Sequence, residues 1–313
     1  MSALKVGTRG SELAMAQCGT LAERFDAEVE LVPITTKGDT DRSSLQQIGG
    51  TGVFVSALRD ALLEGRVDVA VHSMKDLPTA PAEGIELAAV SKREDARDAL
   101  CARDGLTFAE LPEGAKVGTG SPRRMAQLRL ARPDLDVVDL RGNVPTRLAR
   151  AQGPDADLDA VVLALAGLKR LGLEDRATEV LDVIDFPTAP AQGALAVEIR
   201  AGDEAARKAV APTDHASTRA AADAERRVLA GLEAGCAAPL AAHAEVADGM
   251  LFLTASAYAT DGSRKLSASH AYTLDSTKPA ELAEAARDVA ERAVAELLEG
   301  GAADLVHEAR PGS

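Results

Sequence analysis

The stretches KVGTRGS at Lys5–Ser11 and KVGTGS at Lys116–Ser121 resemble each other, and together they decide the fold. Each reads as a short strand that ends in a glycine-rich turn and opens a helix, with a serine as the expected N-cap. Two such units indicate two α/β halves, which we expect to meet near residues 91–98. Because ligands of open α/β sheets bind at the carboxyl ends of the strands, the sequence predicts a cleft between the halves.

Apolar, β-branched runs alternate with helical patterns along the first two thirds of the chain, which is typical of βαβ units and mostly parallel sheets. The expected strands cover residues 4–6, 29–34, 67–71, 85–90, 117, 136–140, 160–163 and 194–199, and expected helices follow Ser11 and Gly52. After about residue 214, the order becomes a helix at 218–232, strands at 241–246, 250–259 and 266–274, and a helix at 279–298. That order predicts a separate, smaller α+β domain.

The overall composition excludes several classes of protein. With 313 residues, 46% of them hydrophobic and 27% charged, the chain has the composition of a globular protein of two or three domains. A net charge of −14 and the absence of Trp argue against binding to nucleic acid or to anionic membranes. The first residues lack a secretory signal, and no apolar run approaches the roughly 18 residues of a membrane-spanning helix. We therefore expect a cytoplasmic protein.

Positive charge is concentrated in one part of this acidic chain. Residues 116–150 contain eight basic and three acidic residues, a net charge of +5, whereas the rest of the chain carries −19. Most of these basic residues are arginines, whose guanidinium groups suit bidentate recognition of carboxylates or phosphates. A solvated helix face is the ordinary alternative, and it suffices for Arg129, Arg132 and Arg150.

Arg123 and Arg124 favour anion binding over a solvated face. If Ser121 is the N-cap and Pro122 the first helical residue, both arginines lie in the first turn of a helix. Cations are unfavourable there, at the positive end of the helix dipole, by roughly 0.3–1 kcal/mol each. An anion bound by both guanidinium groups and the free amides would reverse that cost.

Further arginines lie at the expected loop ends. Arg141 follows the run Val137–Leu140, Arg147 lies near the start of the next helix, and Arg9 has the equivalent strand-to-turn position in the first half. Each is weak evidence when taken singly. Together they indicate one cleft that several anionic groups would occupy.

The segment Val69–Pro78, VAVHSMKDLP, places polar residues after a buried strand. An isolated Asp76 would be read as a turn cap, but beside Lys75 and an arginine-lined cleft it is the best candidate for a catalytic carboxylate. His72 is equally consistent with a hydrogen-bonded sheet histidine and with a functional one. The chain has no P-loop, no complete GxGxxG and no HExxH, so nucleotide and zinc chemistry lack their usual motifs and we expect no metal.

The three cysteines are widely spaced, which supports neither a disulfide framework nor a CxxC metal motif. Cys18 and Cys101 read as structural residues. Cys236 lies in a loop of small residues after a helix, where it could be a buried small hydrophobe or, because its neighbours leave room around the sulfur, an attachment point.

Six motifs, in order along the whole chain, together resemble the porphobilinogen deaminase family, also called hydroxymethylbilane synthases. They are GTRGS at 7–11, VHSMKD at 71–76, GTGSPRR at 118–124, LRGN at 140–143, AGLKR at 166–170 and EAGC at 233–236. The combination of HSMKD with downstream TxSxRR, LRGN and ExGC is highly specific.

The resemblance implies two periplasmic-binding-protein-like α/β domains and a third small α+β domain. Their predicted bounds are 1–92 plus 190–210, 93–189 and 214–313. It also implies a monomeric transferase that joins four molecules of porphobilinogen head to tail into hydroxymethylbilane and releases four ammonia.

The resemblance also implies roles for individual residues. Cys236 would hold a dipyrromethane cofactor through a thioether, as the primer of the chain, and Asp76 would be the catalytic carboxylate. The residues expected to bind the cofactor, besides Cys236, are Lys75, Thr119, Ser121, Arg123, Arg124 and Arg141. Those expected to bind the substrate are Arg9, Ser11, Arg147 and Arg170. The acetate and propionate of every pyrrole account for an arginine-rich cleft in an acidic protein.

The sequence departs from the family pattern at a few places. Thr51 stands where the family often has Lys in the glycine-rich loop, so the sequence does not support a cation there. Ala234 replaces a frequent Gly, and Ala191-Gln192-Gly193 replaces Gly-Gln-Gly, so we expect a less flexible hinge at these two places. Two alternatives remain: a non-catalytic carboxylate-binding protein of the same fold, which would need neither Cys236 nor Asp76, and a phosphate or nucleotide binder that uses the helix after Ser121.

Overall fold

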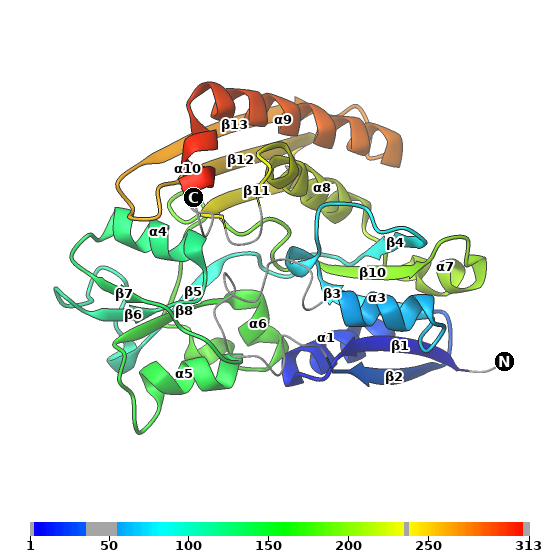
Figure 1. Ribbon diagram of the computed structural model, residues 1–313, viewed down its shortest axis with the longest axis horizontal. Coiled ribbons are helices and arrows are strands. Elements are labelled where there is room, and N and C mark those ends of the chain that lie inside the picture. The colour runs from blue at the N-terminus through cyan, green and yellow to red at the C-terminus, as the bar shows by residue number, and fades with distance from the viewer. Residues whose placement is uncertain (1–2, 36–54, 235–237, 309–313) are drawn as a thin grey trace.

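The chain forms three β-sheets, each accompanied by helices, as Figure 1 shows. The computed structural model describes residues 3–35, 55–234 and 238–308. Two sheets have five strands each, and the third has three. The prediction of two α/β domains and a smaller α+β domain is confirmed at this level of architecture.

The first sheet has the strand order β2-β1-β3-β10-β4. Its strands are β1 (Leu4–Arg9), β2 (Val29–Ile34), β3 (Val69–Ser73), β4 (Ile85–Val90) and β10 (Leu195–Arg200). Its helices are α1 (Glu12–Ala22), α3 (Ser56–Leu63) and α7 (Glu204–Val210). Strand β1 is parallel to β2 and β3, whereas β10 runs antiparallel to both of its neighbours.

The second sheet repeats this pattern with the order β7-β6-β8-β5-β9. Its strands are β5 (Asp98–Ala102), β6 (Lys116–Gly118), β7 (Asp136–Val138), β8 (Ala160–Ala164) and β9 (Glu179–Val180). Its helices are α4 (Pro122–Ala131), α5 (Val144–Gln152) and α6 (Leu165–Arg170). Strand β6 is parallel to β7 and β8, and β5 is antiparallel to β8 and β9.

The prediction of mostly parallel sheets is confirmed for the direction of most strands, but each of these two sheets also contains one strand, β10 or β5, that runs against the others. The chain crosses from the first sheet to the second through residues 91–97 and returns through 181–194. The strand entered after each crossing, β5 in one direction and β10 in the other, runs against its neighbours. Strands β5 and β9 are absent from the predicted set, since neither was recognised as a strand in the sequence.

The third sheet is an antiparallel meander of β11 (Leu240–Ala247), β12 (Met250–Tyr258) and β13 (Lys265–Thr273). Its helices are α8 (Ala216–Gly231), α9 (Pro279–Glu299) and α10 (Ala302–Glu308). One core of alanine, leucine and valine side chains joins them. The described ranges also contain short 3-10 helices at Met74–Asp76 (η1), Arg103–Gly105 (η2), Glu174–Arg176 (η3) and Ala211–Thr213 (η4). Within the described ranges, no helix is long and apolar enough to cross a membrane.

Both predicted N-caps are confirmed. The Ser11 hydroxyl accepts a hydrogen bond from the Ala14 amide, and the Ser121 hydroxyl accepts one from the Arg124 amide. Close packing fixes the turn before α4, because a Cβ at Gly120 would lie 2.5 Å from the carbonyl oxygen of Leu140. The start of α4 is therefore held in one position against the loop that follows β7.

A buried ion pair ties the two crossing segments to the third domain. Arg93 donates to both carboxylate oxygens of Glu225 on α8, at 2.6 and 3.1 Å, and to the carbonyl oxygen of Gln192. Glu225 also accepts from the backbone amides of Ala191 and Ala244. Ala191 has a φ of +62°, in the region that favours glycine. The crossing is thus anchored on α8.

Candidate active site

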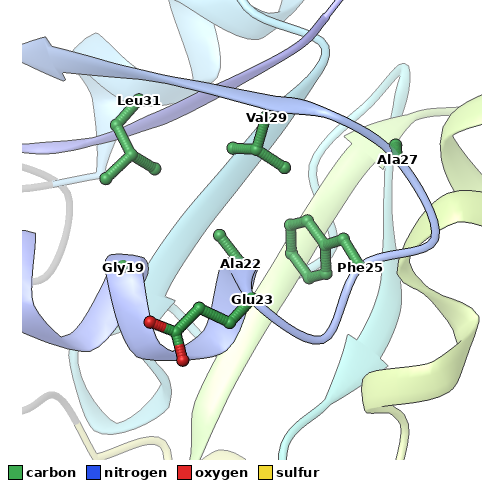
Figure 2. Close-up of a pocket in the computed structure, with 7 residues that line it drawn as sticks. All are labelled: Gly19, Ala22, Glu23, Phe25, Ala27, Val29 and Leu31. Carbon is green, nitrogen blue, oxygen red and sulfur yellow. The ribbon is translucent and has the colours of Figure 1, made fainter.

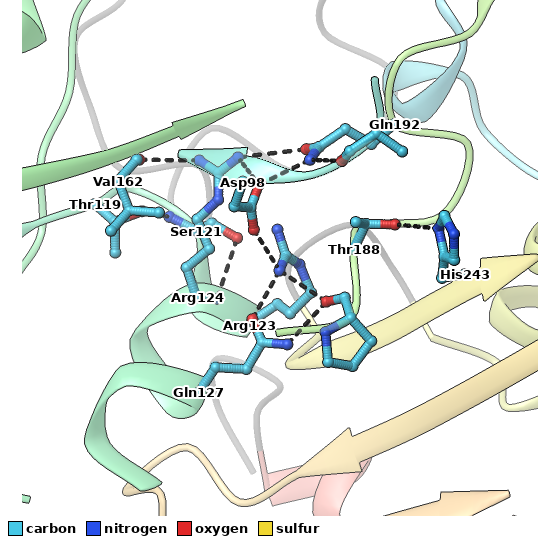
Figure 3. A network of polar contacts seen from close by, with 12 residues as sticks. Asp98, Thr119, Ser121, Arg123, Arg124, Gln127, Val162, Thr188, Gln192 and His243 are labelled. Atoms are coloured by element: carbon cyan, nitrogen blue, oxygen red, sulfur yellow. Dashed lines mark hydrogen bonds and ion pairs between the residues drawn. The ribbon is translucent and has the colours of Figure 1, made fainter. Parts of the chain in front are cut away.

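The carboxylate of Asp98 lies between the guanidinium groups of Arg123 and Arg124 (Figure 3). The distances are 2.8 Å to Arg123 and 2.7 Å to Arg124, and all three side chains are buried. Asp98 is the first residue of β5, and the arginines occupy the first turn of α4. The structure therefore supplies an internal anion at the helix start where the sequence predicted an external one.

Further contacts hold the two arginines in place. Arg124 donates to the carbonyl oxygen of Val162 at 3.1 Å, and Arg123 donates to the Gln127 side chain at 2.7 Å and to the carbonyl oxygen of Pro187 at 3.0 Å. The Nε atoms of Arg123 and Arg124 are buried and have no hydrogen-bond partner among the described residues. Buried donors of this kind are costly unless a ligand or water accepts from them.

The charges of this group do not cancel. Burial by itself would raise the pKa of Asp98, but the two guanidinium groups outweigh it and hold that pKa well below its usual value. Burial lowers the pKa of Arg123, with Asp98 opposing the shift. One carboxylate between two guanidinium groups leaves a net charge of about +1 in a water-poor setting, where it attracts a further anion strongly.

The side chain of Gln192 connects the second half of the molecule to the first. Its amide nitrogen donates to Asp98 at 2.7 Å and to the carbonyl oxygen of Ala96 at 2.6 Å. Its carbonyl oxygen accepts from Arg124 at 3.3 Å and from the amino group of Lys75 at 3.4 Å. Residues of both α/β halves therefore meet at one amide.

Lys75 and Asp76 belong to η1, directly after β3. The pKa of Lys75 is lowered to about 8 by burial and by the charges of Arg124 and Arg123, against the opposing effect of Asp76 and Asp98. Asp76 is half-buried, and its carboxylate and the cations of the second half both act on the Lys75 amino group. The role of Asp76 as a catalytic carboxylate stays a prediction.

Arg141 and Arg147 extend the cluster of positive charge. The pKa of Arg147 is lowered to about 10, mainly by burial and in addition by the nearby charges of Arg124 and Arg141, with Asp139 opposing. Arg147 lies in α5, which begins at an Asn143 N-cap, and its Nε donates to the carbonyl oxygen of Gly142 at 2.7 Å. We call Lys75, Arg123, Arg124, Arg141 and Arg147 the cation cluster.

The other predicted site residues lie at the ends of α6 and β1 and in the turn before α4. Arg170 ends α6 and donates to the carbonyl oxygen of Gly193 at 2.6 Å, and burial lowers its pKa to about 10 with Glu94 opposing. Arg9 is half-buried at the end of β1. The Thr119 hydroxyl accepts from the Ser121 amide at 3.4 Å, so these two residues shape the turn before α4.

Cys236 lies outside the described residues, as does Thr51. The chain can be followed to Ala234, which is buried, and is described again from Ala238, just before β11. Glu233 has a φ of +49° and ends the turn that follows α8. The role of Cys236 therefore stays a prediction.

Sequence reasoning missed Asp98 and Gln192. Asp98 falls at the predicted boundary between the halves, directly before the apolar run Ala99–Ala102, and that position is the one signal that could have identified it as a buried acid. Gln192 appeared in the sequence only as part of a hinge motif. Its contacts come from elements far apart in the chain, which no local pattern reveals.

His72 has a structural partner in the first sheet. Its Nε2 lies 3.1 Å from the Glu198 carboxylate, which accepts two hydrogen bonds from Arg59 of α3. Burial would raise the pKa of Glu198, but His72 and Arg59 outweigh it and lower that pKa to about 2. Of the two readings of His72, the sheet histidine with a partner fits these contacts.

A hollow of about 330 Å³ lies elsewhere, between α1 and the edge strand β2 (Figure 2). Its lining residues are Gly19, Ala22, Glu23, Phe25, Ala27, Val29 and Leu31. The lining is mostly apolar, and its charged side chain is a carboxylate. An anionic ligand is therefore better served by the cation cluster than by this hollow.

Fold and site together define the class: an α/β protein of two similar halves with a third α+β domain, and with cations of both halves gathered beside a carboxylate. Family models match over most of the chain. Residues 4–208 match "Porphobilinogen deaminase, dipyromethane cofactor binding domain", and residues 220–288 match "Porphobilinogen deaminase, C-terminal domain". The chain belongs to the porphobilinogen deaminase family.

Curated relatives agree over nearly their full lengths. The chain is 62% identical to porphobilinogen deaminase of Leifsonia xyli subsp. xyli, with 97% of this chain and 94% of that protein covered. It is 53% identical to porphobilinogen deaminase of Thermobifida fusca, with 98% and 97% covered. Among solved structures, an arginine-specific periplasmic binding protein of Salmonella typhimurium aligns at 14% identity and a TM-score of 0.36, over 68% of this chain and 92% of that one.

Proposed function

We propose that this protein deaminates porphobilinogen and joins four molecules head to tail into hydroxymethylbilane, with a dipyrromethane primer bound covalently to Cys236. Membership of the porphobilinogen deaminase family supports the reaction. The observation in the structure that carries it is the cation cluster beside Asp76, because both substrate and product are polycarboxylates.

Asp76 is the proposed catalytic carboxylate. When ammonia leaves the aminomethyl group of porphobilinogen, positive charge develops on the carbon and on the pyrrole nitrogen. A carboxylate placed beside that nitrogen stabilises this charge and accepts or returns a proton. Lys75, next to it, carries an ammonium group below about pH 8 and can bind a substrate carboxylate.

The residues present fit a bound dipyrromethane. Its acetate and propionate groups would accept hydrogen bonds from the cation cluster and from the unpartnered Nε atoms of Arg123 and Arg124. When bound, this group supplies the pyrrole carbon to which the first substrate is joined. The residues proposed to hold it are Cys236, Lys75, Thr119, Ser121, Arg123, Arg124 and Arg141, and those proposed for the substrate are Arg9, Ser11, Arg147 and Arg170.

The remaining expectations form part of the same proposal. We propose a monomeric, cytoplasmic enzyme that binds neither nucleic acid nor membranes and needs no metal. We also keep the domain bounds 1–92 plus 190–210, 93–189 and 214–313, which are compatible with the membership of the three sheets.

The test is a turnover assay with porphobilinogen. The purified protein is expected to release one ammonia per porphobilinogen consumed and to form a linear tetrapyrrole, detected by its later ring closure in acid. A protein that binds porphobilinogen but neither releases ammonia nor forms tetrapyrrole would instead be the carboxylate-binding protein.

A further inference from the structure

One arginine of the third domain contacts the segment that carries the proposed catalytic carboxylate. Arg226 of α8 donates through Nη1 to the carbonyl oxygens of Leu77 at 2.8 Å and Met74 at 3.4 Å, and through Nη2 to that of Pro78 at 2.7 Å. These three carbonyls enclose Lys75 and Asp76 in the sequence.

We propose that Arg226 is a positioning residue, which holds the turn Met74–Pro78 so that Asp76 is correctly placed for the reaction. The inference rests on the proposed function, since it assigns Arg226 a part in the same site. Arg226 would act on the turnover rate through the backbone of Asp76 and would not itself touch the substrate.

The turn needs such support because its own hydrogen bonds are few. η1 is a single 3-10 turn whose N-cap, Ser73, makes no side-chain capping bond, and its one closing bond runs from the Leu77 amide to the Met74 carbonyl oxygen at 3.2 Å. The carbonyls at the end of a short helix are left without intrahelical donors. The guanidinium of Arg226 supplies donors to them, with a planar geometry that a flexible ammonium does not match.

Arg226 and the crossing segment fix the turn from two sides. The Met74 amide donates to the carbonyl oxygen of Ala194 at 3.0 Å, which anchors the start of the turn to the chain that returns from the second half. Arg226 anchors its end to α8. The backbone of Asp76 lies between these two anchors.

The position of Arg226 on α8 connects this anchor to the rest of the site. The preceding residue, Glu225, holds the crossing segments through Arg93 and the Ala191 amide. Consecutive residues of one helix therefore fix both the catalytic turn and the crossing. The same helix ends at Gly231, five residues before Cys236 in the sequence.

The chain offers a matched control on the same helix. Arg227 is exposed, and it forms a salt bridge with Asp223 one turn earlier on α8, at 2.7 Å. Such exposed pairs contribute little to stability. The test compares Arg226→Gln, Arg226→Lys and Arg227→Gln with the wild type, all as full chains whose primer content is checked by intact mass.

We expect Arg226→Gln to lower kcat for porphobilinogen by about tenfold to a hundredfold with KM changed less than about threefold, because displacement of a catalytic group affects the chemical step. Arg226→Lys is expected to restore kcat in part, since lysine keeps the donors without the planar fork. Arg227→Gln is expected to match the wild type. A kcat within about twofold of wild type in Arg226→Gln, or an equal loss in Arg227→Gln, would overturn the proposal.

Amide hydrogen exchange separates this proposal from the proposed function. Exchange at Lys75, Asp76 and Leu77 is expected to be faster in Arg226→Gln than in the wild type, whatever the protein turns over. Unchanged exchange would refute the anchor, whereas a wild type inactive on porphobilinogen would refute the function alone. If Arg226→Gln does not fold, Arg226→Lys decides: a wild-type kcat together with unchanged exchange contradicts the proposal.

Discussion

Helices α1 and α4 start in equivalent places of the two α/β halves and have opposite electrostatics. Each follows a strand and a glycine-rich turn, and each is capped by a serine. The first turn of α1 holds the exposed Glu12, which suits the helix dipole, whereas that of α4 holds the buried Arg123 and Arg124.

The same α/β scaffold is therefore adapted to two different tasks. In the second half, Asp98 neutralises part of the positive charge that Arg123 and Arg124 place at the start of α4. The positive charge that remains can attract anions. The first half contributes Lys75 and Asp76 from the end of β3. The second half thus supplies most of the charge that binds carboxylates, and the first half supplies the carboxylate proposed to perform the chemistry.

The largest effect is expected from Asp76→Asn, which removes the contribution of the first half and leaves the second intact. Turnover of porphobilinogen should fall by about a hundredfold or more, since an amide cannot exchange the proton that a carboxylate can. Binding of porphobilinogen, measured by calorimetry, should persist through the cation cluster. Near-normal turnover would remove Asp76 from the mechanism and with it the division of tasks.

Asp98→Asn tests whether the second half depends on its internal anion. The change leaves two buried guanidinium groups without a charged partner, which should lower the free energy of unfolding by about 3–5 kcal/mol. Asp157→Asn is the matched control, because Asp157 pairs with Arg150 at an exposed site and its loss should cost less than about 1 kcal/mol. Equal losses in denaturant titrations of the two variants would contradict the assigned role of Asp98.

The lowered pKa of Asp98 predicts how its contribution to the free energy of unfolding depends on pH. Because its pKa is depressed in the folded protein, the stability it contributes is present above the unfolded pKa and is lost as pH falls through the folded pKa. The difference in stability between wild type and Asp98→Asn should therefore be full at neutral pH and shrink in acid. A difference that grows as the pH falls would contradict the ion pair.

The variants Arg147→Leu and Arg150→Leu compare two arginines of the same helix, α5. Arg147 lies near Arg124 and Arg141, whereas Arg150 on the same helix pairs with the exposed Asp157. We expect Arg147→Leu to raise KM for porphobilinogen by about tenfold, the loss of one charge-assisted contact, while Arg150→Leu leaves KM unchanged. An unchanged KM in Arg147→Leu would assign Arg147 to a solvated helix face.

Lys75 gives a smaller, pH-dependent effect. Because its pKa is lowered to about 8, its ammonium form is present below that pH and is lost above it. The value of kcat/KM should therefore fall above pH 8 in the wild type. In Lys75→Arg, whose guanidinium stays charged to about pH 12, this decline should disappear. A decline of the same midpoint in both proteins would assign it to another group.

Local features of the fold were predictable from the residues, because they depend on neighbours in the sequence. The serine caps, Pro122 at the start of α4, and the strands and the helices α8 and α9 of the third domain follow from composition and periodicity, whereas α10 was not predicted. Strand β5 and the antiparallel direction of both β5 and β10 did not follow, since that direction depends on where the chain crosses between sheets. Connections between distant segments leave no periodic signal.

The same distinction applies to the site. The motifs identified Lys75, Asp76, Arg123 and Arg124 as candidate site residues. The partners of Lys75 and Arg124 lie on other elements, and the motifs did not indicate them. Asp98 and Gln192 acquire their roles only when β5 and the returning chain meet α4 and η1. A charge pattern therefore indicated the presence of an anion site without indicating how the protein neutralises part of it.

The central claim is that the cation cluster serves a dipyrromethane primer on Cys236, and intact mass tests it most directly. The wild-type chain, purified from cells that make porphobilinogen, should exceed its sequence mass by one dipyrromethane. Cys236→Ala should lack the addition, while Cys101→Ala, which changes a buried cysteine of β5, should retain it. An unmodified wild-type chain, or an addition that survives in Cys236→Ala, would contradict the claim.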